Sequence, residues 1–399
     1  MVTAPMGPVH LSIPSDVLAG PGALSDSGLA QALRAPEVAD LDAIDELLNR
    51  VVKAKCPVLY VGDDAGPKAF QLATVAFRLG AQLVSSPAGK RWVSHTTACY
   101  KGVVGFSGHP EAREAIHRAD LVVTFGATFD ELSTNAWGAF PDVPVYAVDR
   151  HAEHVHRLPS ARAVIANPAR VIDALLQRLP PTSAVLMRPP RRPTPAMMVQ
   201  SVPDGPVHPK DLMHWVGLVL PSDVAVHVDA GNSFSWSTKN LARSTPDTYR
   251  VAMGLSTMCW AISAAIGATV ATHRRTICIT GDGSMLMSSL ELTVAVEQNL
   301  PVTYIVLNDS SLGMVRHGQK LAGAESVAHQ IAPVRFDQLA KACGAEGIRI
   351  DTLSDLGRIA RRWLALDEGG PCLIDVNIDR AAVPPIGDRV VGLAVGVTR

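Results

Sequence analysis

The sequence of 399 residues lacks any strong excess of one charge and has few cysteines. Its 36 Lys and Arg nearly balance its 37 Asp and Glu, so no surplus of positive charge indicates a nucleic acid or another polyanion as partner. The six cysteines are scattered, without a Cys-x-x-Cys pair and without metal-ligand spacing to His. We therefore expect the cysteines to be buried thiols of a cytoplasmic protein, because the cytoplasm is a reducing compartment. From the balance of charge we expect no nucleic-acid partner.

Signals for export and for membrane insertion are also missing or weak. No charged region followed by an apolar run stands at the N-terminus, so a secretory signal is not expected. Residues 251–272 carry no charged side chain and are long enough to cross a bilayer. They are rich in Ala, Gly, Ser and Thr, however, and open with a glycine turn. We favour a helix packed inside a soluble domain over a membrane span.

What is present is an alternation of apolar strands with helical stretches. This alternation is typical of an α/β protein, and we predict two doubly wound parallel sheets. The predicted strands of the first sheet are 58–61, 121–125, 145–148 and 163–166, and those of the second are 224–228, 276–280, 302–307 and 373–378. Predicted helices include 42–52, 68–79, 111–118 and 288–299.

Proline content and strand pattern suggest how the chain is divided. Val9, Leu11 and Ile13 alternate as in a half-buried strand, so residues 1–29 are interpreted as a remnant strand and linker. A first domain spans 30–179 and a second spans 207–380. Nine prolines lie from Pro180 to Pro209, which predicts an extended linker over 180–206. Residues 381–399 form a C-terminal tail.

The sequence Gly281-Asp282-Gly283-Ser284 follows the predicted strand 276–280, and Asp309 stands 27 residues beyond Asp282, after the next strand. Strands of one parallel sheet end at the same edge, where ligands usually bind. Glycines let the backbone approach phosphate oxygens, and a helix N-terminus supplies N–H groups and positive potential. Two carboxylates with carbonyl oxygens suit Mg²⁺, which commonly bridges protein and diphosphate.

This spacing resembles the metal–diphosphate motif of thiamine diphosphate enzymes, and the surrounding residues resemble the acetolactate synthase group. A lone Gly-Asp-Gly-Ser would be weak evidence, because glycine turns after strands are common. Four further matches, two before and two after this motif, stand in order within some sixty residues. They are Gly254–Met258, Ala264–Ala268, Glu291–Thr293 and Leu312–Val315.

The resemblance implies a set of ligands for Mg²⁺ and thiamine diphosphate. Asp282 corresponds to the aspartate ligand and Ser311 to a main-chain carbonyl donor. Asp309 stands where the family usually has the second Asn of an Asn-Asn pair, so metal affinity is expected to differ. Beside the metal, the expected cofactor-binding residues are Asn232, Ser233, Gly281, Gly283 and Ser284, although the family carries Gln-His in place of the first two.

Three further residues take expected roles around thiamine itself. Met258 matches the bulky residue that keeps thiamine bent, and Ser256 matches the position whose backbone carbonyl accepts from the aminopyrimidine group. Met314 matches a residue facing the substrate. Four positions later the family has a tryptophan and this chain has Gly318, which predicts a wider pocket and puts acetolactate as product in doubt.

The first domain resembles the central domain of these enzymes, which binds FAD in some members. The FAD-binding pattern has an arginine two residues after the glycine that corresponds to Gly126, and this chain has Thr128. We therefore favour a structural domain without flavin, with FAD binding as the alternative.

The family's pyrimidine-binding domain, with the glutamate that activates thiamine, has no counterpart in these residues. Three explanations compete: a split enzyme whose partner chain supplies that domain, a truncated form of a full-length synthase, and a non-catalytic binding or regulatory module. We favour the first, because Met1 shortly precedes the remnant strand and the motif is intact. The resulting hypothesis is the diphosphate-binding subunit of a thiamine diphosphate-dependent carboligase or decarboxylase of 2-oxo acids. It is expected to form a hetero-oligomer, a dimer of heterodimers.

Overall fold

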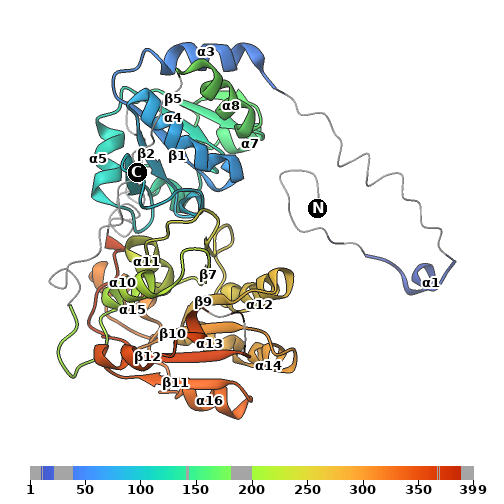
Figure 1. Cartoon of the computed structure of the whole chain (residues 1–399), viewed down its shortest axis with the longest axis vertical. Helices are drawn as coiled ribbons and strands as arrows, with labels where there is room; N and C mark the ends of the chain where they lie inside the picture. The colour runs from blue at the N-terminus through green and yellow to red at the C-terminus, as the bar shows by residue number, and fades with distance from the viewer. Residues whose placement is uncertain are drawn as a thin grey trace.

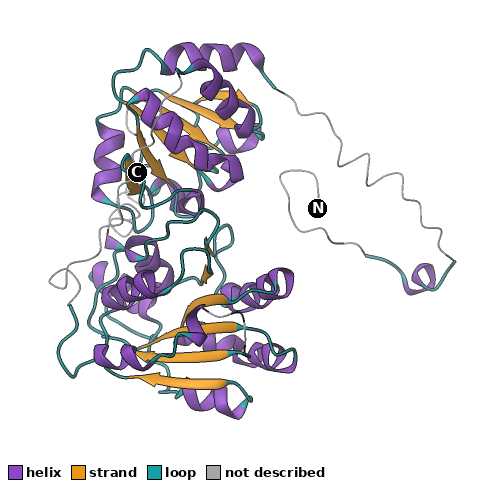
Figure 2. Cartoon of the chain, viewed as in Figure 1, coloured by secondary structure: helices purple, strands orange, loops and turns teal. Residues whose placement is uncertain are grey.

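The computed structural model describes residues 10, 12–21, 39–140, 143–180, 200–365, 367 and 369–387, and they form two six-stranded sheets. Figure 1 shows the two sheets in separate halves of the molecule, and Figure 2 shows helices packed around each of them. All of the strand pairs described within the two sheets are parallel. The predicted fold class is therefore confirmed.

The first sheet has the strand order β3-β2-β1-β4-β5-β6, so its direction of winding reverses between β1 and β4. Its strands are β1 (Pro57–Val61), β2 (Gln82–Ser85), β3 (Tyr100–Val103), β4 (Leu121–Phe125), β5 (Val145–Asp149) and β6 (Arg162–Ile165). The helices are α3 (Leu41–Val51), α4 (Leu72–Leu79), α5 (Pro110–His117), α6 (Glu131–Thr134), α7 (Ala152–Val155) and α8 (Pro168–Arg178), with the 3₁₀ turns η1 (Asp63–Ala65), η2 (Pro67–Gln71) and η3 (Gly89–Trp92).

The second sheet has the order β11-β12-β10-β9-β7-β8. Its strands are β7 (Ala225–Val228), β8 (Tyr249–Val251), β9 (Thr276–Gly281), β10 (Val302–Asn308), β11 (Glu346–Ile350) and β12 (Cys372–Asn377). Its helices are α10 (Pro209–Val219), α11 (Asn232–Asn240), α12 (Trp260–Thr272), α13 (Asp282–Ser288), α14 (Leu292–Glu297), α15 (Gly313–Leu321), α16 (Phe336–Ala342) and α17 (Arg362–Ala365), with η4 (Ser289–Glu291) and η5 (Leu353–Arg358).

Successive residues of a strand point to opposite sides of the sheet, and in both sheets the residues on either side are buried in a core cluster. In β9, Ile277 and Ile279 pack into the cluster that includes α10 and α11 residues, whereas Cys278 packs into the cluster with α12 and α16 residues. The first sheet is divided in the same way between two clusters. This two-sided burial explains why the strands read as continuous apolar runs.

The two sheet domains meet through η3 and α11. Lys90 of η3 is fully buried, and its Nζ donates to the carbonyl oxygens of Ser237 (3.0 Å) and Thr238 (2.8 Å) near the end of α11. Phe106 of the first domain packs edge-on against Phe234 of α11, with ring centroids 5.2 Å apart. The first domain thus supports the helix whose other end opens the candidate site.

Some local predictions were wrong. The helix predicted at 288–299 begins earlier, because Asp282 is already the first residue of α13, and the helical run changes to a 3₁₀ turn at Ser289 before α14. Four strands were missed: β2, β3, β8 and β11. Three of them have only three or four residues. β11 (Glu-Gly-Ile-Arg-Ile) carries glycine and charge, which weaken a strand pattern.

The terminal and linker predictions fall largely outside the described residues. Of the remnant strand, Val9 and Leu11 lie outside them, and Ile13 is exposed in a loop rather than in a strand, with no neighbouring strand described there. Most of the predicted linker (180–206) and tail (381–399) is likewise outside, and the domain boundaries stay predictions. For 251–272, the helix α12 covers 13 residues, and no helix in the described part of the chain is long and apolar enough to span a membrane.

Candidate cofactor and metal site

The ends of three neighbouring strands, β7, β9 and β10, form one pocket. Because they are adjacent in the sheet, the turns that follow them meet at its carboxyl edge. The pocket has a volume of about 130 Å³. All predicted site residues line it except Ser256; the lining includes Asn232, Ser233, Met258, Gly281, Asp282, Gly283, Ser284, Asp309, Ser311 and Met314.

Asp282 is the central carboxylate of this pocket. It is the first residue of α13 and is 4% exposed. Its Oδ1 accepts from the N–H of Gly283 (2.7 Å), and its Oδ2 accepts from the N–H groups of Asp309 and Ser311 (3.2 Å each). Burial first, and then the nearby Asp309 carboxylate, raise the pKa of Asp282 to about 6. One side chain therefore ties the ends of β9 and β10 together.

Asp309 brings a second carboxylate beside the first. Burial raises the pKa of Asp309, although the Arg316 guanidinium of α15, 3.4 Å away, opposes the shift. Arg316 also donates to the carbonyl of Arg380. Two neighbouring buried carboxylates with raised pKa values are the electrostatic condition that a cation relieves. Sequence reasoning did not identify Arg316, whose role depends on the fold bringing α15 back over the turn.

The remaining ligands of a cation here would have to be carbonyl and ligand oxygens. Within the described residues no group of three or more His, Cys, Asp or Glu side chains is placed to hold a metal ion. The carbonyl of Ser311 accepts from the N–H of Gly313 (2.8 Å), which leaves its second lone pair for an ion. This donor set is hard and oxygen-only, so the residues fit Mg²⁺ carrying a diphosphate.

The predicted diphosphate contacts at the start of α11 differ from each other. The Ser233 hydroxyl donates to the carbonyls of Asp229 (3.0 Å) and Ala230 (2.9 Å), so this side chain braces the backbone. Asn232 has a buried Oδ1 without a hydrogen-bond partner among the described residues. Gly231 has a φ of 90° with no atom in the space of a Cβ, which leaves the backbone open to a ligand at this helix N-terminus.

Met258 and Ser256 lie on the loop before α12. The Met258 side chain reaches to the first turn of α13, where its Cε would lie 3.2 Å from a Cβ at Gly283. Ser256, with a φ of 53°, lines an adjoining pocket of about 350 Å³. Met314 lines both pockets. The second pocket extends to residues of the first domain, including Phe106 and Leu132.

Asp229 is a residue whose importance sequence reasoning missed. It is fully buried at the end of β7, and its carboxylate accepts from the N–H of Cys259 (2.9 Å), the hydroxyl of Thr280 (2.9 Å) and the N–H of Ala261 (3.3 Å). It therefore fixes the Met258 loop to the strand that leads into Asp282. An aspartate directly after an apolar strand was the available signal.

In the first domain, the turns at the β1/β4 crossover pack against each other. A Cβ at Gly62 would lie 2.0 Å from the carbonyl oxygen of Gly126, and a Cβ at Gly126 would lie 2.1 Å from the backbone of Asp64. These glycines are thus required by contact between two backbone turns. The interpretation of this domain as structural and without flavin, with FAD binding as the alternative, stays a prediction.

Comparison with known proteins gives the same assignment for both domains. Residues 44–175 match the family model of the central domain of thiamine pyrophosphate enzymes, and residues 229–376 match that of their C-terminal TPP binding domain. The chain is 29% identical to a putative acetolactate synthase large subunit of Mycobacterium tuberculosis, over 98% of this chain and 73% of the relative. It is 28% identical to the acetolactate synthase isozyme 2 large subunit of Escherichia coli, over 94% and 68%. Two family domains in the expected order, with the cofactor pocket in the second, establish the family: the chain belongs to the thiamine pyrophosphate enzymes.

Proposed function

We propose that this chain is the diphosphate-binding subunit of a split thiamine diphosphate-dependent carboligase or decarboxylase that acts on a 2-oxo acid. The observation that carries the proposal is the pocket at the ends of β7, β9 and β10, where two buried carboxylates face a helix N-terminus. That combination suits a divalent cation and a diphosphate together.

Each part of the pocket has a task in this proposal. Asp282, Asp309 and the Ser311 carbonyl hold Mg²⁺, while Asn232 and the backbone at Gly281–Ser284 hold the diphosphate. Met258 would contact the thiamine, and the Ser256 carbonyl would accept a hydrogen bond from its aminopyrimidine group. When bound, thiamine diphosphate supplies an electron sink for cleavage beside the keto carbon of a 2-oxo acid. Met314 and the adjoining pocket of about 350 Å³ receive the substrate.

Exposed apolar side chains on the loop before α12 and in the segment after Asp282 support a partner domain. Leu255, which lines the adjoining pocket, is 89% exposed, and Met287 and Leu290, which follow Asp282 in the chain, are 63% and 70% exposed. Large apolar side chains grouped beside a ligand site commonly mark a protein interface. A pyrimidine-binding domain on a partner chain would cover them and bring the activating glutamate, giving a hetero-oligomer, in our proposal a dimer of heterodimers. All six cysteines are free thiols, which agrees with a cytoplasmic location.

The test mixes this chain with a candidate pyrimidine-domain chain, thiamine diphosphate, Mg²⁺ and a panel of 2-oxo acids that includes pyruvate, and follows CO₂ release. We expect release only when both chains are present. Asp282→Ala should abolish it and reduce cofactor affinity at least tenfold. Asp223→Ala, which removes an exposed carboxylate paired with Arg274, is the control and should behave as the parent. No CO₂ from any 2-oxo acid would refute the catalytic proposal, and unchanged cofactor affinity in Asp282→Ala would refute the metal assignment.

A further inference from the structure

The turn after β10, here called the metal turn (residues 308–311), is held from two sides. On one side, the N–H groups of Asp309 and Ser311 donate to Asp282. On the other, Asn308 turns its side chain away from Asp282 and into the protein. Asn308 is 6% exposed, so its amide needs partners inside the fold.

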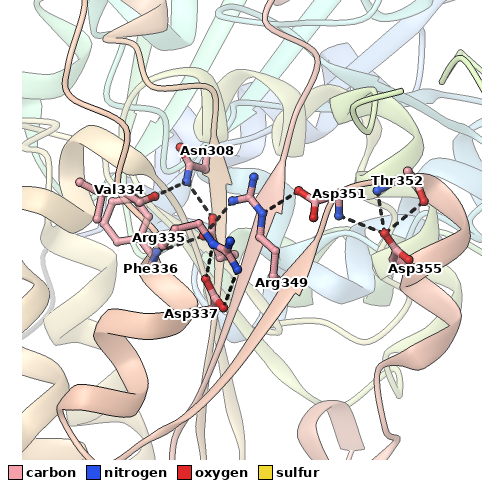
Figure 3. Close-up of polar contacts among 10 residues, drawn as sticks. Asn308, Val334, Arg335, Phe336, Asp337, Arg349, Asp351, Thr352 and Asp355 are labelled. Atoms are coloured by element: carbon pink, nitrogen blue, oxygen red, sulfur yellow. Dashed lines mark hydrogen bonds and ion pairs between the residues drawn. The ribbon is translucent and has the colours of Figure 1, made fainter. Parts of the chain in front are cut away.

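Both ends of the Asn308 amide are occupied. Its Nδ2 donates to the carbonyl of Val334 (3.0 Å) and to Oδ1 of Asp375 (2.8 Å), as Figure 3 shows for Asn308 and Val334. Its Oδ1 accepts from the N–H of Ser310 (3.4 Å), whose φ of 53° requires local support. Asn308 therefore sets the shape of the metal turn without facing the cation site.

Asp375 lies on β12, is fully buried, and has apolar neighbours along the strand. Its Oδ2 accepts from the N–H of Phe336 (3.0 Å) and forms an ion pair with Arg349 of β11 (2.8 Å). Figure 3 shows Arg349 reaching on to Asp351, whose N–H in turn donates to Asp355. Two hydrogen-bond donors, from Asn308 and Phe336, and the guanidinium of Arg349 thus converge on one carboxylate.

Stability alone does not explain a buried carboxylate here, because a buried ion pair often stabilises a fold no more than apolar residues of the same volume. A carboxylate is, however, the side chain of its size that only accepts hydrogen bonds, and it matches two converging donors and a neighbouring cation. The substitution Asp375→Asn would turn a donor NH₂ against one of them.

We propose that Asp375 is a positioning residue for the metal site: through Asn308 it holds the metal turn so that Asp309 and the Ser311 carbonyl face Asp282. This inference rests on the proposed function, since it assigns a purpose to the geometry around the Mg²⁺ ligands. Asp375 itself does not contact the cation.

The test compares the full-length parent with Asp375→Asn in two measurements. Hydrogen exchange at the amides of residues 309–311, without cofactor, reports directly on the turn, and we expect it to accelerate at least tenfold. Binding of thiamine diphosphate is then titrated with Mg²⁺. We expect the half-saturating Mg²⁺ concentration to rise at least tenfold, and the affinity for thiamine diphosphate to recover at saturating Mg²⁺.

Two further variants keep the test decisive. Asn308→Ala removes the same hydrogen bond but leaves Asp375 with Phe336 and Arg349, so it serves if Asp375→Asn does not fold, and we expect the same losses. Asp337→Asn alters another buried aspartate of this domain, which pairs with Arg335, and should match the parent. Unchanged exchange in both Asp375→Asn and Asn308→Ala, or equal acceleration in Asp337→Asn, would overturn the inference. A parent that fails to bind the cofactor would count against the proposed function instead, and the exchange measurement would still decide the role of Asp375.

Discussion

At the scale of single residues, Gly313 shows how closely the cofactor pocket is packed. It is the first residue of α15, and a Cβ there would lie 2.3 Å from Nδ2 of Asn232. Asn232 would have to move, and with it a side chain that lines the pocket. Glycine is needed here because Asn232 of α11 occupies the place of a Cβ, and not because the backbone has a positive φ.

We therefore expect Gly313→Ala to weaken thiamine diphosphate binding about tenfold with little loss of stability. The matched control is Gly318→Ala in the same helix, where no atom lies within 4 Å of the added Cβ. An alanine in a helix interior is favourable by about 1 kcal/mol over glycine, so the control should bind normally and unfold at a slightly higher temperature. Calorimetric titration and thermal unfolding measure both effects. Equal affinity in the two variants would contradict the role given to Asn232.

Sequence reasoning identified many residues of the pocket but not all of their interactions. Asp282, Asp309 and Ser311 come together because a fixed motif spacing places them at adjacent strand ends. Contacts that cross the fold, such as the Arg316–Asp309 ion pair or the grip of Asp229 on the Met258 loop, leave no local pattern. They depend on how helices return to the sheet, which spacing alone does not encode.

At the scale of elements, the contact between α11 and the first domain includes a histidine that must stay neutral. The Nδ1 of His109 accepts from the N–H of Val103 (3.0 Å), and its Nε2 lies 3.1 Å from the carbonyl of Lys239. A neutral ring with its proton on Nε2 satisfies both. Burial, and then the charges of Lys90 and Lys239, lower the pKa of His109 to about 4.

This shift predicts a loss of stability in acid. Because the pKa of His109 is lower in the folded state than the usual 6.5, the unfolded state takes up the proton first as the pH falls. The stabilisation is present above pH 6.5 and is lost toward pH 4, with a magnitude of about 3 kcal/mol. The free energy of unfolding of the parent should therefore fall more steeply with decreasing pH than that of His109→Gln. Parallel curves for the two proteins from pH 7.5 to 4.5 would contradict the prediction.

The same scale shows which elements a sequence pattern can predict. The strands that flank the pocket, β7, β9 and β10, were predicted because both of their faces are buried and they read as unbroken apolar runs. The helix after Asp282 was misplaced, because its first turn is Asp-Gly-Ser, residues that usually favour turns. In the fold that turn lies at the pocket, where small residues leave room for a ligand.

At the scale of the whole molecule, the cofactor should add stability that depends on the metal. The nearby Asp309 carboxylate disfavours the ionised form of Asp282, and a bound cation would relieve this. A ligand at 100 times its Kd stabilises a folded protein by about 2.7 kcal/mol. We expect thiamine diphosphate with Mg²⁺ to raise the unfolding temperature by several degrees, measured calorimetrically. EDTA should reverse the effect, and Asp282→Ala should show none; a rise that survives EDTA would exclude a metal-bridged site.

The arrangement of α11 has a thermodynamic consequence for the molecule. This helix of nine residues presents its N-terminus to the candidate cofactor pocket, while the carbonyls near its C-terminus accept hydrogen bonds from the Lys90 amino group of the first domain. The two ends are roughly 13 Å apart, and a bound diphosphate would lie at the positive end of the helix dipole, while the Lys90 amino group lies at its negative end. If cofactor binding strengthens the docking of the two domains, then docking strengthens cofactor binding by the same free energy, because the coupling is reciprocal. A solvent condition or a substitution that separates the domains would then lower the affinity for the diphosphate.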